Sequence, residues 1–436
     1  MKVKCITIIG ANGTVGAQVA GLLAAFCEAE VYLISRTIEK SMAAVENAVK
    51  SVRADSIRPI LIPKTYQDLE ECVSHSDWVF ESVAEDLAIK QDINKLIALA
   101  RRPGTIVSTG TSGISVETLA SVFDEEARSL YFGTHFFNPP YSLPFLEFTK
   151  TKWSDRQIAE EFFAYLETTV LRKAIHTRDR AAFLGNRIGF LFLNEVAQFA
   201  QIYKDRGGID YMDAILGSFT GRSMAPLNTI DFVGLDIHKA ILDNIHDCEP
   251  EFYSAEQILP SYIDQLILEG KLGRKAGEGL FKMEYTVDGQ KRKTVYDIAT
   301  ASYRPVKQYE FEFANQMIVN LTDGLYQDAI NCLLAERSDE AEICRYFLVK
   351  YVLCSYLNAQ QVSENIADAD IAMSYGFGWV PPSALCRLLG GRKGIQRLID
   401  SDIRLQENVK QYDFSLLDQA VRTTDIDYRR YFKATR

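Results

Sequence analysis

A glycine-rich turn near the N-terminus constrains the fold of this chain more than any other feature. The β-branched run Val3–Ile9 is typical of a buried strand, and Thr14–Cys27 is typical of a helix. Glycines at such a junction let the backbone approach a pyrophosphate, which the unpaired N–H groups and positive dipole end of the helix can bind. The turn predicts a dinucleotide-binding unit, with a tight turn that binds no ligand as the alternative. Its candidate cofactor contacts are Gly10, Asn12, Gly13, Thr14, Val15 and Gly16, spaced Gly-x-x-Gly-x-x-Gly.

Short β-prone runs continue to alternate with helical stretches through the first half of the chain. The runs Glu30–Ile34, Asp77–Glu81 and Thr105–Ser108 are further expected strands. Such alternation predicts a parallel, doubly wound α/β sheet. From about Ala181 onward, long helical periodicity replaces the strand signals. We therefore expect an α/β Rossmann-like N-terminal domain followed by an all-α C-terminal region.

The C-terminal region is expected to contain two helical units related by a diverged repeat. Residues 209–215 resemble residues 366–372, and each stretch leads through a glycine to a proline. Chance similarity between two amphipathic helices is the alternative. The polar stretch 285–293 carries an Asp-Gly turn signal and predicts a hairpin or linker between the units. The expected domains are residues 1–180, 181–290 and 291–436.

Composition narrows the class of protein. The 436 residues exceed a usual single domain, and 47% hydrophobic with 24% charged residues is ordinary for a soluble globular protein. The formal net charge of -10 argues against a nucleic-acid partner. The eight cysteines are scattered, without the close pairs of a zinc site or the density of a disulfide framework, and no apolar run reaches membrane-spanning length. We expect a cytoplasmic protein with no metal, signal peptide or membrane segment.

The end of the second expected strand bears on which nicotinamide cofactor binds. An acidic residue there would accept hydrogen bonds from the adenosine ribose, but this chain has Ser35 followed by Arg36. The guanidinium of Arg36 and the hydroxyl of Ser35 suit a 2′-phosphate, which favours NADP. The alternative is a solvated Arg36 and a weaker ribose contact with NAD. Both cofactors remain candidates at this point.

His135 is the strongest candidate for acid–base chemistry near neutral pH. It is one of five histidines, and Glu147 follows it by twelve residues, after a Phe-Phe-Asn-Pro turn. An imidazole suits proton transfer to or from an alcohol near pH 7. A carboxylate on its other ring nitrogen would fix the tautomer and stabilise the imidazolium. A histidine with a structural role is the alternative.

Six motifs, in their order along the chain, carry a resemblance to a known family. They are residues 82–90, 108–115, 133–140, 184–188, 231–236 and 273–281. With these motifs the chain resembles the 3-hydroxyacyl-CoA dehydrogenase family, and within it the dehydrogenase part of fatty-acid β-oxidation proteins. The resemblance covers most of residues 1–282 and continues more faintly to the C-terminus. It implies a Rossmann-like domain, a helical domain that includes the dimer contacts, and NAD as cofactor.

The resemblance also implies roles for individual residues. His135 corresponds to the family's catalytic histidine and Glu147 to its paired carboxylate. The other correspondences are Ser112 with the serine that contacts the substrate oxygen, Asn186 with the asparagine that positions the substrate, and Glu85 and Lys90 with residues that line the nicotinamide and pyrophosphate region. Helix and turn capping are the structural alternatives for Ser112 and Asn186, and a salt bridge is the alternative for the other two.

The chain departs from the family pattern in three places. The glycine turn is one residue longer, and Ser35 stands where the family has its ribose-binding acid. The segment between the second strand and Leu61 is shorter than in members that contact CoA there, so no CoA-binding residue is assigned. The basic loop at Gly273-Arg274-Lys275 is equally consistent with solvation.

The expected activity is reversible oxidation of (3S)-3-hydroxyacyl-CoA to 3-oxoacyl-CoA by an NAD(P)-dependent oxidoreductase whose partner is an acyl-CoA substrate. No crotonase-like segment adds a hydratase activity. The second helical unit would cover the surface through which shorter relatives dimerise, so a monomer and a homodimer both remain open. Two further hypotheses are an NADPH-linked 3-oxoacyl-CoA reductase and a catalytically idle nucleotide-binding protein.

Overall fold

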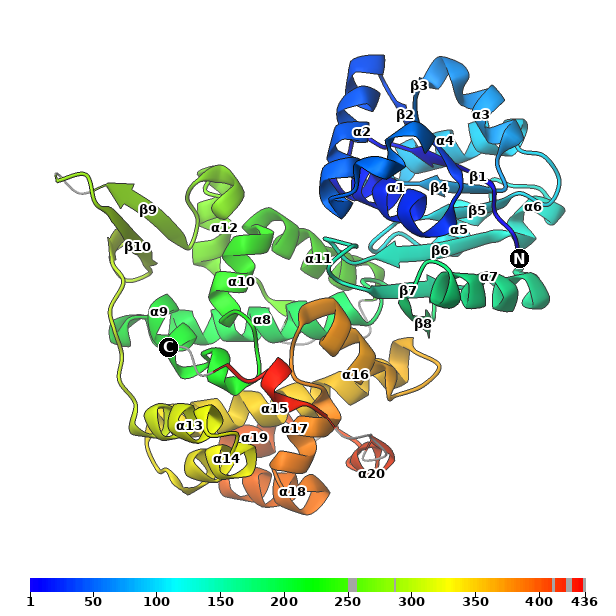
Figure 1. Cartoon of the computed structure of the whole chain (residues 1–436). Coiled ribbons are helices and arrows are strands. Elements are labelled where there is room, and N and C mark those ends of the chain that lie inside the picture. Colours follow the sequence, from blue (N-terminus) through cyan, green and yellow to red (C-terminus); the bar gives the residue numbers. More distant parts are fainter. Residues whose placement is uncertain (250–256, 286–287, 410–411, 421–425, 434–436) are drawn as a thin grey trace. The chain divides into compact units, whose positions relative to one another are not determined.

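A sheet of eight strands lies at the centre of the first of two units into which the chain divides (Figure 1). The computed structural model describes residues 1–249, 257–285, 288–409, 412–420 and 426–433. The first unit comprises residues 1–184 and 362–365, and the second comprises residues 185–361 and 366–436. The strands are β1 Cys5–Ile9, β2 Glu30–Ser35, β3 Leu61–Thr65, β4 Trp78–Glu81, β5 Ile106–Thr109, β6 Tyr131–Phe136, β7 Phe145–Thr149 and β8 Lys173–Thr177.

The order of the strands produces a switch point beside β1. They lie in the order β3-β2-β1-β4-β5-β6-β7-β8, and only β6 and β7 pair antiparallel. The chain leaves β1 toward β2 and β3 on one side and resumes with β4 on the other. The carboxyl ends of β1 and β4 are therefore where open α/β sheets bind their ligands. This arrangement confirms the predicted doubly wound α/β sheet.

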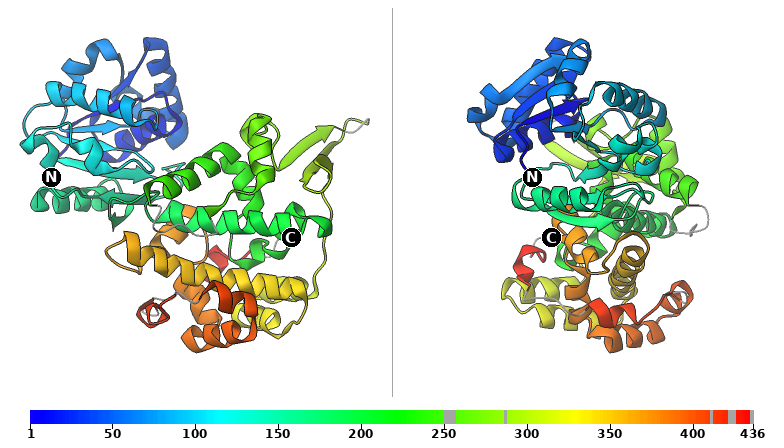
Figure 2. Two further views of the ribbon diagram at one scale, coloured as in Figure 1. Left: turned by 180° about the vertical axis from the view of Figure 1, so that it is seen from behind. Right: turned by 90° about the vertical axis from the view of Figure 1, so that its right-hand side faces the viewer.

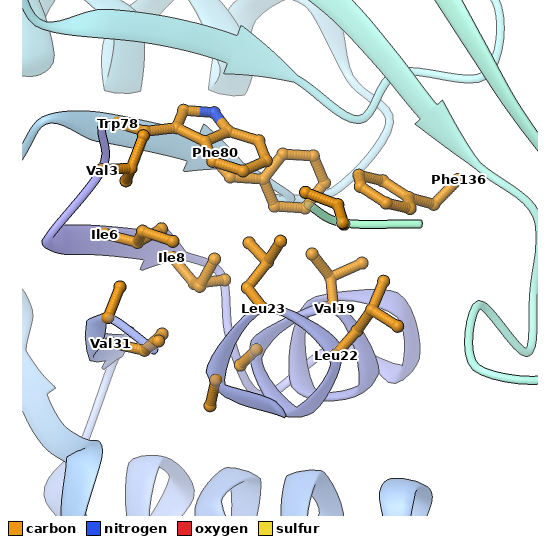
Figure 3. Packing of buried hydrophobic residues seen from close by; sticks show 14 of the residues in the cluster. Val3, Ile6, Ile8, Val19, Leu22, Leu23, Val31, Trp78, Phe80 and Phe136 are labelled. Atoms are coloured by element: carbon orange, nitrogen blue, oxygen red, sulfur yellow. The ribbon is translucent and has the colours of Figure 1, made fainter. Parts of the chain in front are cut away.

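Helices cover both faces of the sheet (Figure 2). They are α1 Thr14–Cys27, α2 Ile38–Val52, α3 Leu69–His75, α4 Leu87–Ala100, α5 Val116–Ala120, α6 Glu125–Ser129 and α7 Arg156–Thr168. Helices α1, α2 and α7 share a buried apolar cluster with one face, and α3 to α6 share another with the opposite face. In the first cluster, Ile8 of β1 lies against Leu23 of α1 and near Phe80 of β4 (Figure 3). The first strand and helix thus pack against each other on either side of the glycine turn.

The second unit is largely helical, as predicted. Its helices are α8 Gly185–Ile202, α9 Ile209–Ile215, α10 Pro226–Val233, α11 Leu235–Cys248, α12 Ser261–Leu268, α13 Glu312–Thr322, α14 Tyr326–Ala335, α15 Asp339–Val362, α16 Asp368–Ala372, α17 Pro382–Leu388, α18 Gly391–Ser401, α19 Ile403–Asn408 and α20 Leu416–Ala420. The two longest, α8 and α15, lie side by side through ring contacts such as Phe192 with Phe347 and Phe199 with Tyr346 (Figure 2). Within the described residues, no helix has both the length and the apolar character that a membrane span would need.

A three-stranded antiparallel sheet corrects the expectation of an all-α region. Strands β9 Phe281–Tyr285 and β10 Lys291–Asp297 form the predicted hairpin, although residues 286 and 287 lie outside the described residues. Strand β11 Ser302–Pro305 adds a third, unpredicted strand. Its Tyr303 packs against Tyr296 of β10 with ring centroids 5.7 Å apart, which favours the extra pairing.

The two similar stretches of the C-terminal region make the same local structure. Asp213 of α9 accepts the backbone N–H groups of Leu227 and Asn228 at the start of α10. Asp370 of α16 accepts the backbone N–H of Ser383 at the start of α17. These carboxylates occupy the same place in the two stretches, and each caps a helix that begins with proline. The contacts support the diverged repeat, while the domain boundary at residue 290 stays a prediction.

Candidate active site

His135 and Glu147 meet because β6 and β7 pair in register. The two residues lie directly opposite each other on the antiparallel strands, where side chains on one face are neighbours. The His135 Nδ1 and Glu147 Oε2 atoms are 2.6 Å apart, and the residues are only 7% and 0% exposed. The other carboxylate oxygen, Oε1, accepts the backbone N–H of Leu184 at 2.8 Å. One oxygen of Glu147 thus orients the imidazole while the backbone holds the other.

Aromatic side chains surround this pair. The ring of His135 lies 5.0 Å from that of Phe137 and 5.7 Å from that of Phe183, measured between centroids. Both phenylalanines are buried. Apolar surroundings of this kind exclude water and strengthen the hydrogen bond between the imidazole and the carboxylate.

The glycine turn leaves its helix open to an anion. Gly10 has a φ of 84°, and a Cβ there would lie 2.5 Å from the carbonyl oxygen of Ser82, so only glycine lets the turn pass this close to β4. Helix α1 begins at Thr14, and its N-cap residue, Gly13, provides no side-chain cap. Its first-turn N–H groups therefore remain available for a phosphate. Asn12 and Thr14 are exposed, whereas Gly10 and Gly16 are buried in the turn.

Lys90 is buried in a network of two carboxylates, one of which the sequence reasoning missed. Its Nζ lies 3.0 Å from Oε1 of Glu81, at the end of β4, and 3.3 Å from Oε2 of Glu85. Lys90 is 1% exposed and Glu81 is 0% exposed. The salt bridge considered for Glu85 and Lys90 is therefore present. In the sequence, Glu81 is a carboxylate at the end of a strand expected to be buried. A buried carboxylate needs a cation beside it, and this requirement could have identified Glu81 as the partner of Lys90.

Glu85 organises the turn that contains Ser112. Its Oε1 accepts the Thr111 hydroxyl at 2.5 Å and the backbone N–H groups of Ser112 and Gly113 at 2.8 and 3.2 Å. Burial alone would raise the pKa of Glu85, but Lys90 and these hydrogen bonds together lower it. Glu85 is thus a carboxylate that fixes the backbone beside Ser112, whose own side chain remains partly exposed.

At the end of β2, Ser35 and Arg36 differ in their exposure. The hydroxyl of Ser35 is buried without a hydrogen-bond partner among the described residues. Arg36 is exposed, and its charge opposes the rise that burial imposes on the pKa of Tyr66. The backbone N–H groups of Gly10 and Ala11 donate to the carbonyl of Ile34. Arg36 therefore follows a strand end that is hydrogen-bonded to the glycine turn.

Asn186 stands in the first turn of α8 and is 9% exposed. It belongs to the second unit, whereas His135, Glu147, Ser112, Glu85 and the glycine turn all belong to the first. The structure brings the histidine to its carboxylate and the serine turn to Glu85. The role of Asn186 stays a prediction.

The residues of the first unit fit a dinucleotide. The open start of α1 suits a pyrophosphate, and the turn around Gly10 allows a close backbone approach at the switch point of the sheet. At the adenosine end the described residues offer the cation of Arg36, because Ser35 replaces an acid.

Comparison with known proteins points to one family. Residues 5–180 match the model of the 3-hydroxyacyl-CoA dehydrogenase NAD binding domain, and residues 183–283 match that of the 3-hydroxyacyl-CoA dehydrogenase C-terminal domain. A probable 3-hydroxyacyl-CoA dehydrogenase of Bacillus subtilis is 28% identical over 345 residues, 78% of this chain and 42% of the relative. A putative fatty acid oxidation complex trifunctional enzyme of Rickettsia felis is 25% identical over 393 residues, 87% of this chain and 52% of the relative.

The chain spans about half the length of these curated relatives. Among solved structures, a 3-hydroxybutyryl-CoA dehydrogenase from Escherichia coli aligns with a TM-score of 0.69 at 19% identity and covers 97% of this chain and 98% of that one. That likeness shows that the same fold extends over both units. With an N-terminal domain of the family's NAD-binding type and a helical domain matched directly after it, the chain belongs to the 3-hydroxyacyl-CoA dehydrogenase family.

Proposed function

We propose that this chain is a 3-hydroxyacyl-CoA dehydrogenase that reversibly oxidises (3S)-3-hydroxyacyl-CoA to 3-oxoacyl-CoA. The buried hydrogen bond between His135 and Glu147 is the observation that carries the proposal. Oxidation of a secondary alcohol needs a base for the hydroxyl proton while hydride leaves the same carbon. A nicotinamide held by the first unit, which belongs to the family's NAD binding domain, would supply the acceptor for that hydride.

His135 takes the hydroxyl proton through Nε2, because its Nδ1 is engaged by Glu147. Glu147 keeps the imidazole in the matching tautomer and stabilises the imidazolium that forms. In the reverse direction the imidazolium returns the proton to the oxygen. Ser112 binds the substrate oxygen at the reacting carbon, and the amide of Asn186 positions the substrate.

The glycine turn and residues near the ends of β2 and β4 would hold the cofactor. The first-turn N–H groups of α1, with Asn12 and Thr14, would hold its pyrophosphate. Glu85 shapes the wall beside the nicotinamide, and Lys90 acts by holding Glu85. Lys90 thus supports the site indirectly, since its ammonium is occupied by two carboxylates.

The wider setting is part of the same proposal. Acyl-CoA is the substrate, the cytoplasm is the compartment, and the protein is a monomer or a homodimer. None of the eight cysteines forms a disulfide in the part of the chain that the structure describes, which suits a reducing compartment. A place in fatty-acid oxidation is supported by relatives whose names carry that process.

Turnover of acetoacetyl-CoA tests the proposal. The rate of its reduction is followed at the nicotinamide absorbance with NADH and NADPH in parallel, and 3-oxoacyl-CoAs of longer chain are then substituted. Saturable turnover with any of them supports a dehydrogenase. Nucleotide binding without turnover of any acyl-CoA would contradict it and would favour the idle nucleotide-binding protein.

An NADPH-linked reductase is a second candidate, which the exposed Arg36 favours. If its guanidinium holds a 2′-phosphate, adenosine 2′,5′-bisphosphate should bind more tightly than ADP, and Arg36→Ala should remove that preference. Arg53→Ala, at an exposed arginine at the other end of α2, is the matched control. Isothermal titration measures both ligands without turnover. Equal affinity for the two nucleotides in the unchanged protein would leave NAD alone as the cofactor.

A further inference from the structure

A short segment at the end of the first unit has an unusual backbone. Ala182 and Phe183 are consecutive residues with φ angles of 58° and 47°. This left-handed region is uncommon for any residue with a Cβ, because the side chain crowds the backbone carbonyl. Both residues are buried, 1% exposed, so the conformation is enforced by packing and not by solvent. Strained backbone that packing maintains is frequently associated with a functional site.

The segment leads directly to the catalytic pair. Leu184, the next residue, donates its backbone N–H to Oε1 of Glu147 at 2.8 Å. The ring of Phe183 packs against His135, with centroids 5.7 Å apart. The two left-handed residues therefore direct the backbone N–H of Leu184 toward the carboxylate and the ring of Phe183 toward the imidazole.

The other end of the segment is anchored to α5. The carboxylate of Asp179 accepts the backbone N–H groups of Val116 and Glu117, each at 2.8 Å, and the hydroxyl of Ser115 at 2.8 Å. Between the two ends, Phe183 donates its N–H to the carbonyl of Arg180 and closes a turn. Residues 179–184 are thus fixed at both ends within the first unit.

We propose that residues 179–184 are a positioning clamp, in which the left-handed pair Ala182–Phe183 holds Glu147, and through it His135, in the orientation needed for proton transfer. The clamp acts through Glu147 and does not itself contact the substrate. It sets the direction of the carboxylate by occupying Oε1, which leaves Oε2 for the imidazole. The expected effect of the clamp on kcat rests on the proposed function. Its effect on the hydrogen bond between His135 and Glu147 does not.

The test compares two substitutions of Ala182 that differ in their tolerance of positive φ. Glycine adopts this backbone readily, whereas β-branched valine disfavours it. Ala182→Val should lower kcat by about 10- to 100-fold, with nucleotide affinity kept within about twofold, because a small displacement of the base costs rate and not cofactor binding. Ala182→Gly should preserve the left-handed backbone conformation and therefore keep kcat near that of the unchanged protein. If Ala182→Val does not fold, Asp179→Asn, which weakens the anchor, takes its place with the same expectation.

A readout that needs no substrate follows the hydrogen bond itself. In protein labelled with ¹⁵N-histidine, the ring proton on His135 Nδ1 should resonate far downfield, assigned by its absence in His135→Gln. It should shift or disappear in Ala182→Val and persist in Ala182→Gly. Leu171→Val is the matched control, because Leu171 also has a positive φ, 57°, but its side chain is exposed.

The outcomes separate the two proposals. A folded Ala182→Val protein with unaltered resonance and kcat, or an equal loss of rate in Leu171→Val, would overturn the clamp. Absence of turnover in the unchanged protein would overturn the proposed function, while the resonance would still decide whether the clamp positions His135.

Discussion

At the scale of single residues, the site depends on strand register more than on sequence distance. Glu147 lies twelve positions after His135, yet the two face each other because the intervening turn joins antiparallel β6 and β7. The family resemblance indicated this pair, but the two strands that bring the residues together were not predicted. The run Tyr131–Phe136 contains a glycine and a histidine in place of regular alternation, so its strand character was not recognised.

Removing the charge of Glu147 should affect the rate far more than binding. Glu147→Gln keeps the side-chain volume but presents an amide that can impose the wrong imidazole tautomer, so kcat should fall by about 10²- to 10⁴-fold. Nucleotide affinity, measured by fluorescence titration, should stay near that of the unchanged protein. Glu167→Gln, at an exposed position at the end of α7, is the control. A loss of less than about threefold in kcat would argue against the pairing as the basis of catalysis.

Lys90 should matter for stability because its charge is buried. Lys90→Met leaves Glu81 buried without its cation and should lower the free energy of unfolding by about 3–5 kcal/mol. The double change Glu81→Gln with Lys90→Met should recover much of that loss. Lys95→Met is a matched control on the same helix, because the pair of Lys95 with Asp92 is exposed and should contribute about 1 kcal/mol or less. Urea denaturation measures the three variants and the unchanged protein, and equal losses for the two lysines would contradict this assignment.

At the scale of elements, the clearest local patterns were predicted best. The helix expected at Thr14–Cys27 has those bounds, and the first strand differs only at its N-terminal end. Strand β3 was missed because Pro63 interrupts it, which a sheet tolerates at its edge, where β3 lies. The short polar run of β11 likewise gave no local signal and forms through its pairing with β10. The strands with weak local sequence signals thus form because of their tertiary contacts.

The helix caps of the repeat should make stability depend on pH. Burial raises the pKa of Asp213 to about 7, well above the ordinary value of an aspartate, even though backbone N–H groups oppose the shift. Between pH 4 and 7 the folded state then holds more protons than the unfolded state, so the unfolding free energy should fall as pH rises, on the order of 1–3 kcal/mol. Asp213→Asn should flatten this slope. Asp323→Asn, at an exposed residue after α13, should not.

Urea denaturation at several pH values between 4 and 7.5 measures this slope. Asp370, whose pKa burial raises to about 6, should give a smaller effect that ends at lower pH. A slope unaffected by Asp213→Asn would mean that the cap is ionised throughout this range.

At the scale of the whole molecule, the order of fold classes along the chain was predictable and its long-range connections were not. An alternating first half and a helical second half follow from periodicity alone. The return of residues 362–365 to the first unit does not, because it rests on one bridge between Thr177 and Ser363 and on backbone hydrogen bonds from Arg178 to Val362 and from Glu364 to His176. A polar segment after a long helix carries no pattern that reveals such a partner. The clamp at Ala182 and Phe183 could not be predicted either, because no sequence pattern indicates a positive φ at a non-glycine residue.

The proposed dehydrogenase activity depends on His135 acting as the acid–base group. The most direct measurement is kcat for acetoacetyl-CoA reduction by the unchanged protein and by His135→Gln, with the dissociation constant of NADH determined for both. We expect kcat to fall by at least about 10³-fold while the dissociation constant changes by less than about threefold. Equal losses in turnover and in nucleotide binding, or a variant that still turns over at a comparable rate, would contradict the central claim.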